Sequence, residues 1–249
     1  MQESVPVAAP EARPLDANVG PSPAGSPADP LSDPRALQIL STEHWSLLAS
    51  RSLAYNEAFS RAGMFLTFLS ASLIVIGFLI GSQGLSSAVV PVIAILLVAD
   101  LVIGLATVGR LFDASAEELQ CVRGMNRIRH AYREMVPGLE PYFVSGFHDD
   151  APGVLATYGA TARPGLLANI LHGLTTAVGM VAAIDVMILG ALLALAAIAM
   201  GAGVGLALAV AIIGSVLMFI GFAMLGTRSA LGGQARAEAR FPTPGDSEG

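Results

Sequence analysis

Four long apolar stretches constrain this chain more than any other feature. They cover about 63–80, 88–108, 175–200 and 204–225, and each approaches the roughly 20 residues that a helix needs to cross a bilayer. Hydrophobic residues make up 54% of the chain and charged residues only 13%. A soluble fold lacks the charged surface to cover so much apolar side chain. The sequence therefore predicts an all-α, polytopic membrane protein with four transmembrane helices and cytoplasmic helical extensions.

The arginines predict how these helices are oriented. All 13 basic residues are arginine, and none lies in the short connections at 81–87 and 201–203. With four spans, every arginine-bearing segment falls on one side, and the positive-inside rule makes that side the cytoplasm. Both termini are therefore expected to be cytoplasmic. Three spans with one re-entrant segment is the alternative. Arginine without lysine, in a chain rich in Ala and Gly, further suggests a high-GC bacterium and its inner membrane.

Composition divides the rest of the chain. The first 34 residues hold eight of the 15 prolines and no aromatic residue, which predicts a disordered tail. The expected segments are the tail (1–34), a first hairpin with cytoplasmic extensions (35–136), a cytoplasmic connector (137–174), a second hairpin (175–226) and a C-terminal tail (227–249).

Two acidic residues lie within the apolar stretches. At about 1.5 Å per residue, Asp100 and Asp185 lie roughly 12 and 15 Å from the inner ends of their spans. A bare carboxylate at such a depth is costly and often functional. One interpretation is a proton or cation site in which both acids face one interior cavity. The alternatives are neutral acids that bond to a neighbouring helix, for example through Thr107, Thr175 or Thr176, or a misjudged depth.

A basic face is predicted on the cytoplasmic extension of the second span. Arg123, Arg127 and His130 share one helical face, and Arg129 and Arg133 share an adjacent one. Guanidinium groups suit phosphate, so this face could contact anionic lipid or a soluble anion. The alternative is a salt-bridged face, for which Glu117, Glu118 and Glu134 are the expected partners.

The cytoplasmic extension before the first span carries apolar residues at helical spacing. They predict a face that packs on the second extension or on a neighbouring subunit, or alternatively a ligand platform built on Trp45 and Tyr55. The other members of this set are Leu37, Leu40, Leu47, Leu48 and Phe59.

Pairs of small residues four apart predict close helix contacts or self-association. The three pairs are Gly77 with Gly81, Gly179 with Ala183, and Gly201 with Gly205.

Several classes of chemistry lack their residues. Without lysine there is no Schiff base, and Cys121 is the only cysteine, so one chain offers no disulfide. No nucleophile-elbow, zincin, P-loop or dinucleotide motif occurs. The sequence His148, Asp149, Asp150 is the one tight cluster that could bind a metal, although polar turn chemistry is the ordinary explanation. The net charge of −6 argues against nucleic acid. We expect no enzyme activity, cofactor or metal.

One stretch resembles known bacterial membrane proteins. It covers 37–135 and includes Ser-Thr-Glu-His-Trp at 41–45, Arg-Ser-Leu-Ala-Tyr at 51–55 and Met-Asn-Arg-Ile-Arg-His-Ala-Tyr at 125–132. This stretch resembles an uncharacterised family of bacterial integral membrane proteins. Its layout of helix, two spans and helix is also similar to the SLATT-type two-span domains, which implies a membrane effector in bacterial conflict systems. The second pair of spans departs from that layout, and no functional residue is carried over.

Three functions are compatible with these observations. The first is a self-associating, non-enzymatic membrane protein, for which a channel or pore is one role. The second is a small proton- or cation-coupled transporter that uses Asp100 and Asp185. The third is a membrane scaffold or sensor that binds anionic lipid or a soluble anion through its basic face.

Overall fold

The computed structural model of the chain describes residues 29–159, 173–236 and 238–244. Within these ranges the chain is helical and contains no β-strand, which confirms the predicted all-α class. Most of the predicted N-terminal tail, part of the connector and the extreme C-terminus lie outside the described residues.

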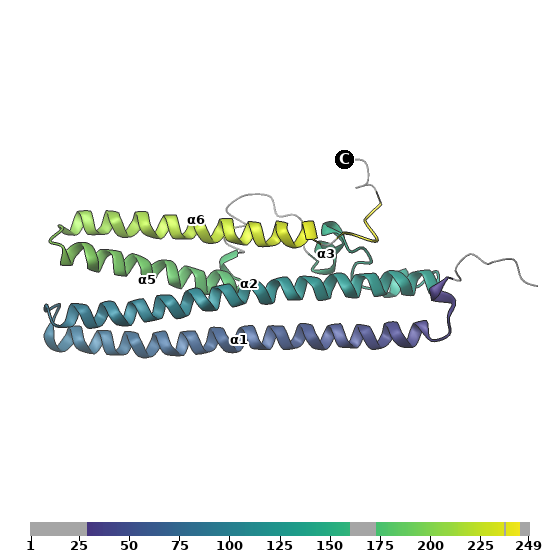
Figure 1. Cartoon of the computed structure of the whole chain (residues 1–249), viewed down its shortest axis with the longest axis horizontal. Helices are drawn as coiled ribbons and strands as arrows, with labels where there is room; N and C mark the ends of the chain where they lie inside the picture. Colours follow the sequence, from purple (N-terminus) through teal and green to yellow (C-terminus); the bar gives the residue numbers. More distant parts are fainter. Residues whose placement is uncertain (1–28, 160–172, 237, 245–249) are drawn as a thin grey trace, which may run out of the picture.

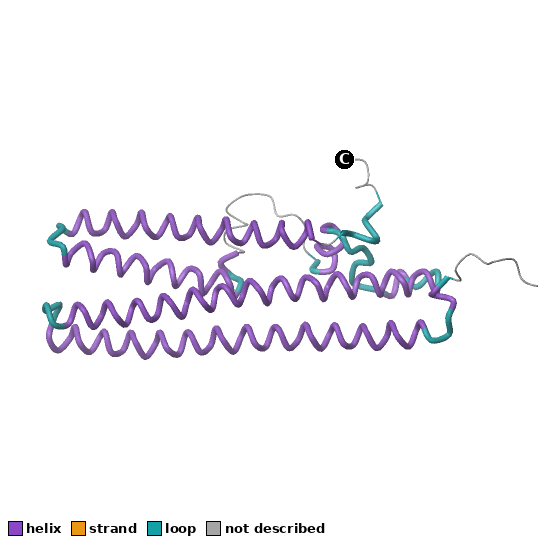
Figure 2. Tube along the Cα trace, in the orientation of Figure 1, coloured by secondary structure: helices purple, strands orange, loops and turns teal. Residues whose placement is uncertain are grey.

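Four long helices form two antiparallel hairpins that lie side by side (Figures 1 and 2). Each helix contains a stretch that is long and apolar enough to cross a membrane, so the predicted four-span architecture is confirmed. The helices are α1 (Ala36–Gln83), α2 (Val89–Met135), α5 (Ala177–Ala199) and α6 (Val204–Arg236).

Local sequence explains where these helices begin and end. The Asp33 carboxylate accepts the N–H of Arg35 at 2.8 Å directly before α1, and Thr176 Oγ1 accepts the N–H of Gly179 at 3.1 Å at the start of α5. Within each hairpin, the turn between the two helices needs a residue with a positive φ angle. Gly84 (φ 65°) and Gly201 (φ 86°) provide it. Each turn is therefore short enough to keep its two helices in contact.

The helices α1 and α2 are much longer than a membrane is thick. Their 48 and 47 residues correspond to about 70 Å, against about 30 Å for the hydrocarbon core. The short turns lie together at one end of the molecule, and the described start and end of the chain lie toward the other (Figure 1). Half of the first hairpin thus projects beyond its apolar part. The helix α6 also extends past the predicted span end at 225, as far as Arg236.

The helices pack in sequence order, α1 on α2, α2 on α5 and α5 on α6, so α1 and α6 lie at opposite edges. The main apolar cluster joins the first three helices and includes Phe65, Val108 and Val181, which are almost completely buried. Small residues line the α1–α2 contact, among them Ala54, Ala58 and Ala62. They allow these two helices to approach closely over much of their length.

The apolar face of the first cytoplasmic extension, which was predicted to pack on the second extension, is mostly exposed. Trp45 is 67% exposed, and Leu37, Leu48, Tyr55 and Phe59 are exposed as well. Of that set, Leu47 packs in a second small cluster with Val122, Met125 and Val154. Packing on α2 was therefore the wrong expectation for the large side chains, because the alanines occupy the contact instead. Packing on a neighbouring subunit stays a prediction.

A small polar layer covers the projecting end of α2. It contains the 3₁₀ turn η2 (Glu140–Tyr142), the short helix α3 (Ala151–Thr157) and the irregular segment 238–244. A second 3₁₀ turn, η1 (Pro30–Ser32), precedes α1.

Candidate functional site

The two intramembrane acids lie inside the helix assembly. Asp100 on α2 and Asp185 on α5 are both 0% exposed. Within the described part of the chain, none of their four carboxylate oxygens has a hydrogen-bond partner. Buried polar groups in folded proteins are nearly always paired, so an unpaired carboxylate needs an explanation of its own.

Gly104 brings the two acids close together. A Cβ built on Gly104 would overlap Oδ1 of Asp185, so the carboxyl group of Asp185 lies directly against the backbone of α2. Gly104 follows Asp100 by one helical turn on the same face, a separation of about 6 Å between Cβ positions. Asp185 therefore lies against α2 one helical turn from Asp100, while Asp100 itself lies beside Ser72 of α1.

A third helix contributes a hydroxyl group. Ser72 on α1 is 4% exposed and lies beside Asp100, although neither oxygen of Asp100 forms a hydrogen bond of ordinary geometry. Thr107, predicted as a partner, donates instead to the carbonyl of Ile103 in its own helix at 2.7 Å. The hydroxyl of Thr176 donates to the carbonyl of Gly173 at 2.7 Å. Neither threonine hydroxyl donates to an acid.

This arrangement suits a proton better than a metal ion. Oxygen-binding cations take about six ligands, and the described residues contain no group of three or more His, Cys, Asp or Glu side chains that could hold a metal. A proton needs only one carboxylate at a time. Two neighbouring carboxyl groups can also share one proton, which leaves a single charge between the helices.

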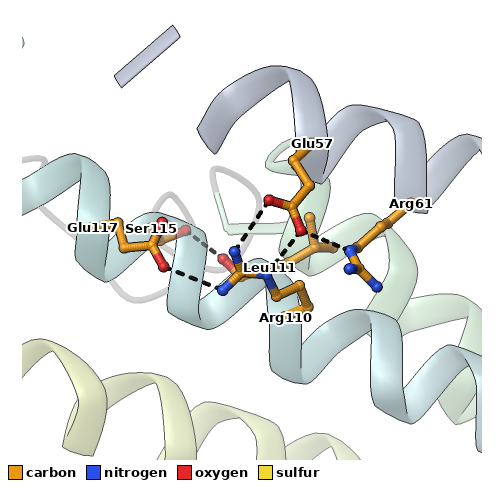
Figure 3. Close-up of polar contacts among 6 residues, drawn as sticks. All are labelled: Glu57, Arg61, Arg110, Leu111, Ser115 and Glu117. Atoms are coloured by element: carbon orange, nitrogen blue, oxygen red, sulfur yellow. Dashed lines mark hydrogen bonds and ion pairs between the residues drawn. The ribbon is translucent and has the colours of Figure 1, made fainter. Parts of the chain in front are cut away.

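An ion-pair network joins α1 and α2 just beyond the apolar stretch. Arg110 contacts both oxygens of Glu57 at 3.2 Å and Oε1 of Glu117 at 3.1 Å, and Arg61 contacts Glu57 at 3.0 Å (Figure 3). Further along, Arg51 contacts Glu118 at 2.7 Å. Glu117 and Glu118 therefore pair with these arginines. The network marks the end of the apolar region and fixes the register of the two helices.

Most of the predicted basic face is engaged in contacts within the protein. Arg127 pairs with Asp149 at 2.6 Å, Arg129 donates to Asn126 at 2.7 Å, and Arg133 lies 3.4 Å from Glu140. His130 lies 3.3 Å from Glu134, the one predicted acidic partner that does contact this face. Arg123 is buried. These contacts favour a structural role for the residues over phosphate binding.

The cluster His148, Asp149, Asp150 is the centre of the polar layer. Asp149 accepts the main-chain N–H groups of Arg240 and Phe241 at 2.9 and 2.8 Å, in addition to Arg127. Burial raises the pKa of Asp149, but these hydrogen bonds outweigh it and hold the pKa below its ordinary value. Asp150 caps α3 by accepting the N–H of Gly153 at 2.9 Å. Every carboxylate oxygen of this pair has a partner.

Asn126 holds this layer against α2 and was not identified from the sequence. It is 0% exposed and donates to the carbonyls of His148 and Gly153 at 2.8 and 3.3 Å, while its carbonyl oxygen accepts from Arg129 and Thr157. An asparagine between arginines on an otherwise amphipathic helix gives no local signal for such a role.

The pairs of small residues predicted from the sequence do not form the close helix–helix contacts seen in the described part of the chain. Gly77, Gly81, Gly201 and Gly205 have no other part of the described chain within 4 Å of a built Cβ. Gly179 packs on the residues just before its own helix, and Ala183 is half-buried. The close helix approaches are at other glycines. Gly104 meets Asp185, Gly190 meets Ser215, and Gly214 meets Leu193.

Comparisons with protein-family models, with curated proteins and with solved structures found no match to this chain.

Proposed function

We propose that this protein moves protons across the membrane, alone or coupled to a solute, with Asp100 and Asp185 as the groups that bind and release the proton. The observation that carries the proposal is the burial of both carboxyl groups inside the helix assembly without hydrogen-bond partners among the described residues. Carboxyl groups that only held helices together would be expected to bond across them.

The geometry supports transfer between the two acids. Asp185 lies against Gly104, and Gly104 lies one turn from Asp100. Ser72 of α1 supplies a hydroxyl group beside Asp100. No enzymatic reaction is needed for this role.

The test is proton flux into liposomes that contain the purified protein, followed with a trapped pH-sensitive dye. We expect Asp100→Asn and Asp185→Asn each to lower the flux at least about tenfold, because an amide cannot take up and release a proton at neutral pH. Asp113→Asn is the matched control, since Asp113 is an exposed carboxylate on the same helix beyond the apolar stretch.

Two results would contradict the proposal. One is wild-type flux in both intramembrane variants. The other is an absence of flux in the folded wild-type protein under both a pH gradient and a membrane potential. Replacing sodium with choline in the buffer separates proton movement from sodium coupling, because only the latter would fall.

We further propose that the protein lies in a bacterial inner membrane with both termini in the cytoplasm. The support is the arginine distribution together with the position of both described ends at the end of the molecule opposite the short turns. Cys121, the only cysteine, lies on the projecting half of α2 and is half-buried. A membrane-impermeant maleimide should therefore label it in inverted vesicles and not in intact cells.

Self-association is a second proposal. Its specific support is the row-like packing, which leaves α1 and α6 at opposite edges, with Gly77 and Gly205 at surfaces that no other part of the described chain covers. Crosslinking in native membranes should give a discrete oligomer, and Gly77→Leu should reduce it. Unchanged crosslinking in the variant would assign this surface to lipid.

A further inference from the structure

The segment 238–244 is held like a bound peptide. It has no helix or strand of its own and bends at Arg240 and Phe241, and its main chain bonds to Arg127 on the projecting part of α2 and to the loop before α3. The segment is short, and its described contacts are concentrated on a few side chains of that layer.

One buried and one half-buried carboxylate bind its main chain. Asp149, whose side chain is 0% exposed, accepts the N–H groups of Arg240 and Phe241, one on each oxygen. Asp150 accepts the N–H of Thr243 at 2.6 Å and its hydroxyl at 3.0 Å. The residue between these donors is Pro242, which has no N–H. The three N–H groups of Arg240, Phe241 and Thr243 thus each meet a carboxylate oxygen of the site.

Side chains and a carbonyl add selectivity. The ring of Phe241 stacks on His130 with centroids 4.1 Å apart. The carbonyl of Phe241 accepts the N–H of Asp149 at 3.3 Å and lies 3.2 Å from Nδ1 of His148. The segment thus offers the site an aromatic ring at Phe241 and a hydroxyl group at Thr243, with Pro242 between them.

We propose that Asp149 and Asp150 form a recognition site for a peptide segment without regular secondary structure, and that the chain's own segment 238–244 is a detachable clasp in that site. The bound clasp holds the C-terminal end of α6 beside α2 and so joins the two hairpins at their projecting end, in addition to the packing of α2 on α5. The proposal is independent of the proton site.

The balance of opposing terms makes the clasp detachable. Hydrogen bonds to carboxylates are among the stronger ones in proteins. Ordering a segment that has no secondary structure costs backbone entropy at every residue. Pro242 and Pro244 reduce that cost because they restrict the free segment toward extended conformations.

Hydrogen–deuterium exchange of the full-length protein in detergent tests the bound state. We expect the peptide that covers 238–244 to exchange at least tenfold more slowly than a free chain, and to lose this protection in Asp149→Asn. Phe241→Ala should lose it as well, and this variant leaves the receiving layer unaltered. The matched control Asp113→Asn removes an exposed carboxylate from α2 and should keep the protection.

A second experiment tests recognition. A fluorescent synthetic peptide with the sequence of 238–244 is added to full-length Phe241→Ala protein, whose own clasp is weakened and whose site is intact. We expect the anisotropy of the peptide to rise and saturate as it binds. We expect no binding to the double variant that carries Asp149→Asn in addition to Phe241→Ala. Free-chain exchange in the wild-type segment, protection that survives both single variants, or failure of the peptide to bind would each overturn the proposal.

Discussion

Two pairs of aspartates stand in opposite situations in this molecule. Asp149 and Asp150, in the polar layer, accept hydrogen bonds from main-chain N–H groups, a hydroxyl and a guanidinium. Asp100 and Asp185, in the apolar region, accept none among the described residues. The same side chain therefore builds structure where hydrogen bonds satisfy it, and the unpaired pair is the one for which we propose proton chemistry.

The largest expected effect is a difference in unfolding free energy between a variant of the bonded pair and a variant of the unbonded pair. Asp149→Asn should lower the free energy of unfolding of the polar layer by about 3 kcal/mol, because it breaks charge-assisted bonds and leaves donors unpaired. Asp185→Asn should leave stability unchanged or raise it, since no hydrogen bond of the described structure is lost. Thermal unfolding by circular dichroism in one detergent compares them. Equal losses would mean that Asp185 has a structural partner after all.

The next effect concerns the contact that positions Asp185. Gly104→Ala should cost about 2 kcal/mol, because the new methyl group would occupy the place of the Asp185 carboxyl group. The double variant with Asp185→Ala should recover most of this loss, a coupling of about 1–2 kcal/mol. Gly77→Ala is the matched control. It adds the same methyl group where no other part of the described chain lies within 4 Å, so its effect should stay within about 1 kcal/mol.

Acid should release the clasp before it unfolds the helices. The pKa of Asp150 lies below its ordinary value because the N–H groups of Thr243 and Gly153, among other contacts, outweigh the opposing effect of burial. Asp149 is shifted in the same direction. A lowered pKa contributes stability that is complete above the unfolded value of about 3.9 and is lost as the pH falls through the folded value. The clasp should therefore hold at neutral and mildly acidic pH.

The measurement is the anisotropy of a dye on Glu238→Cys, in a Cys121→Ser background, as the pH is lowered. We expect little change down to about pH 4 and a fall in anisotropy below it. In Asp149→Asn the anisotropy should already be low at neutral pH. A transition near pH 6 to 7 would instead assign control to the neighbouring histidines.

The sequence predicts the membrane helices well and the polar layer poorly. Apolar length is a local property, so the four spans could be inferred directly, and the two acids within them are buried in the structure. Contacts between distant residues could not be inferred. The approach of Gly104 to Asp185 depends on helix packing, and the pairing of Asp149 with Phe241 joins positions 92 residues apart. The exposed Trp45 and Tyr55 show the same limit, since alanines occupy the α1–α2 contact.

The smallest expected effect tests whether burial, and not the number of bonds, decides what a charge contributes. Arg110 makes two ion pairs, with Glu57 and Glu117, yet its side chain is 31% exposed. Such pairs are screened by solvent, so Arg110→Gln should cost no more than about 1 kcal/mol, and less in high salt. Arg61→Gln, with one partner and 49% exposure, should cost less still. Arg110→Gln could instead destabilise the protein as much as Asp149→Asn does. The number of bonds, and not burial, would then account for the stability of the polar layer. The missing hydrogen bonds of Asp100 and Asp185 would need an explanation other than function.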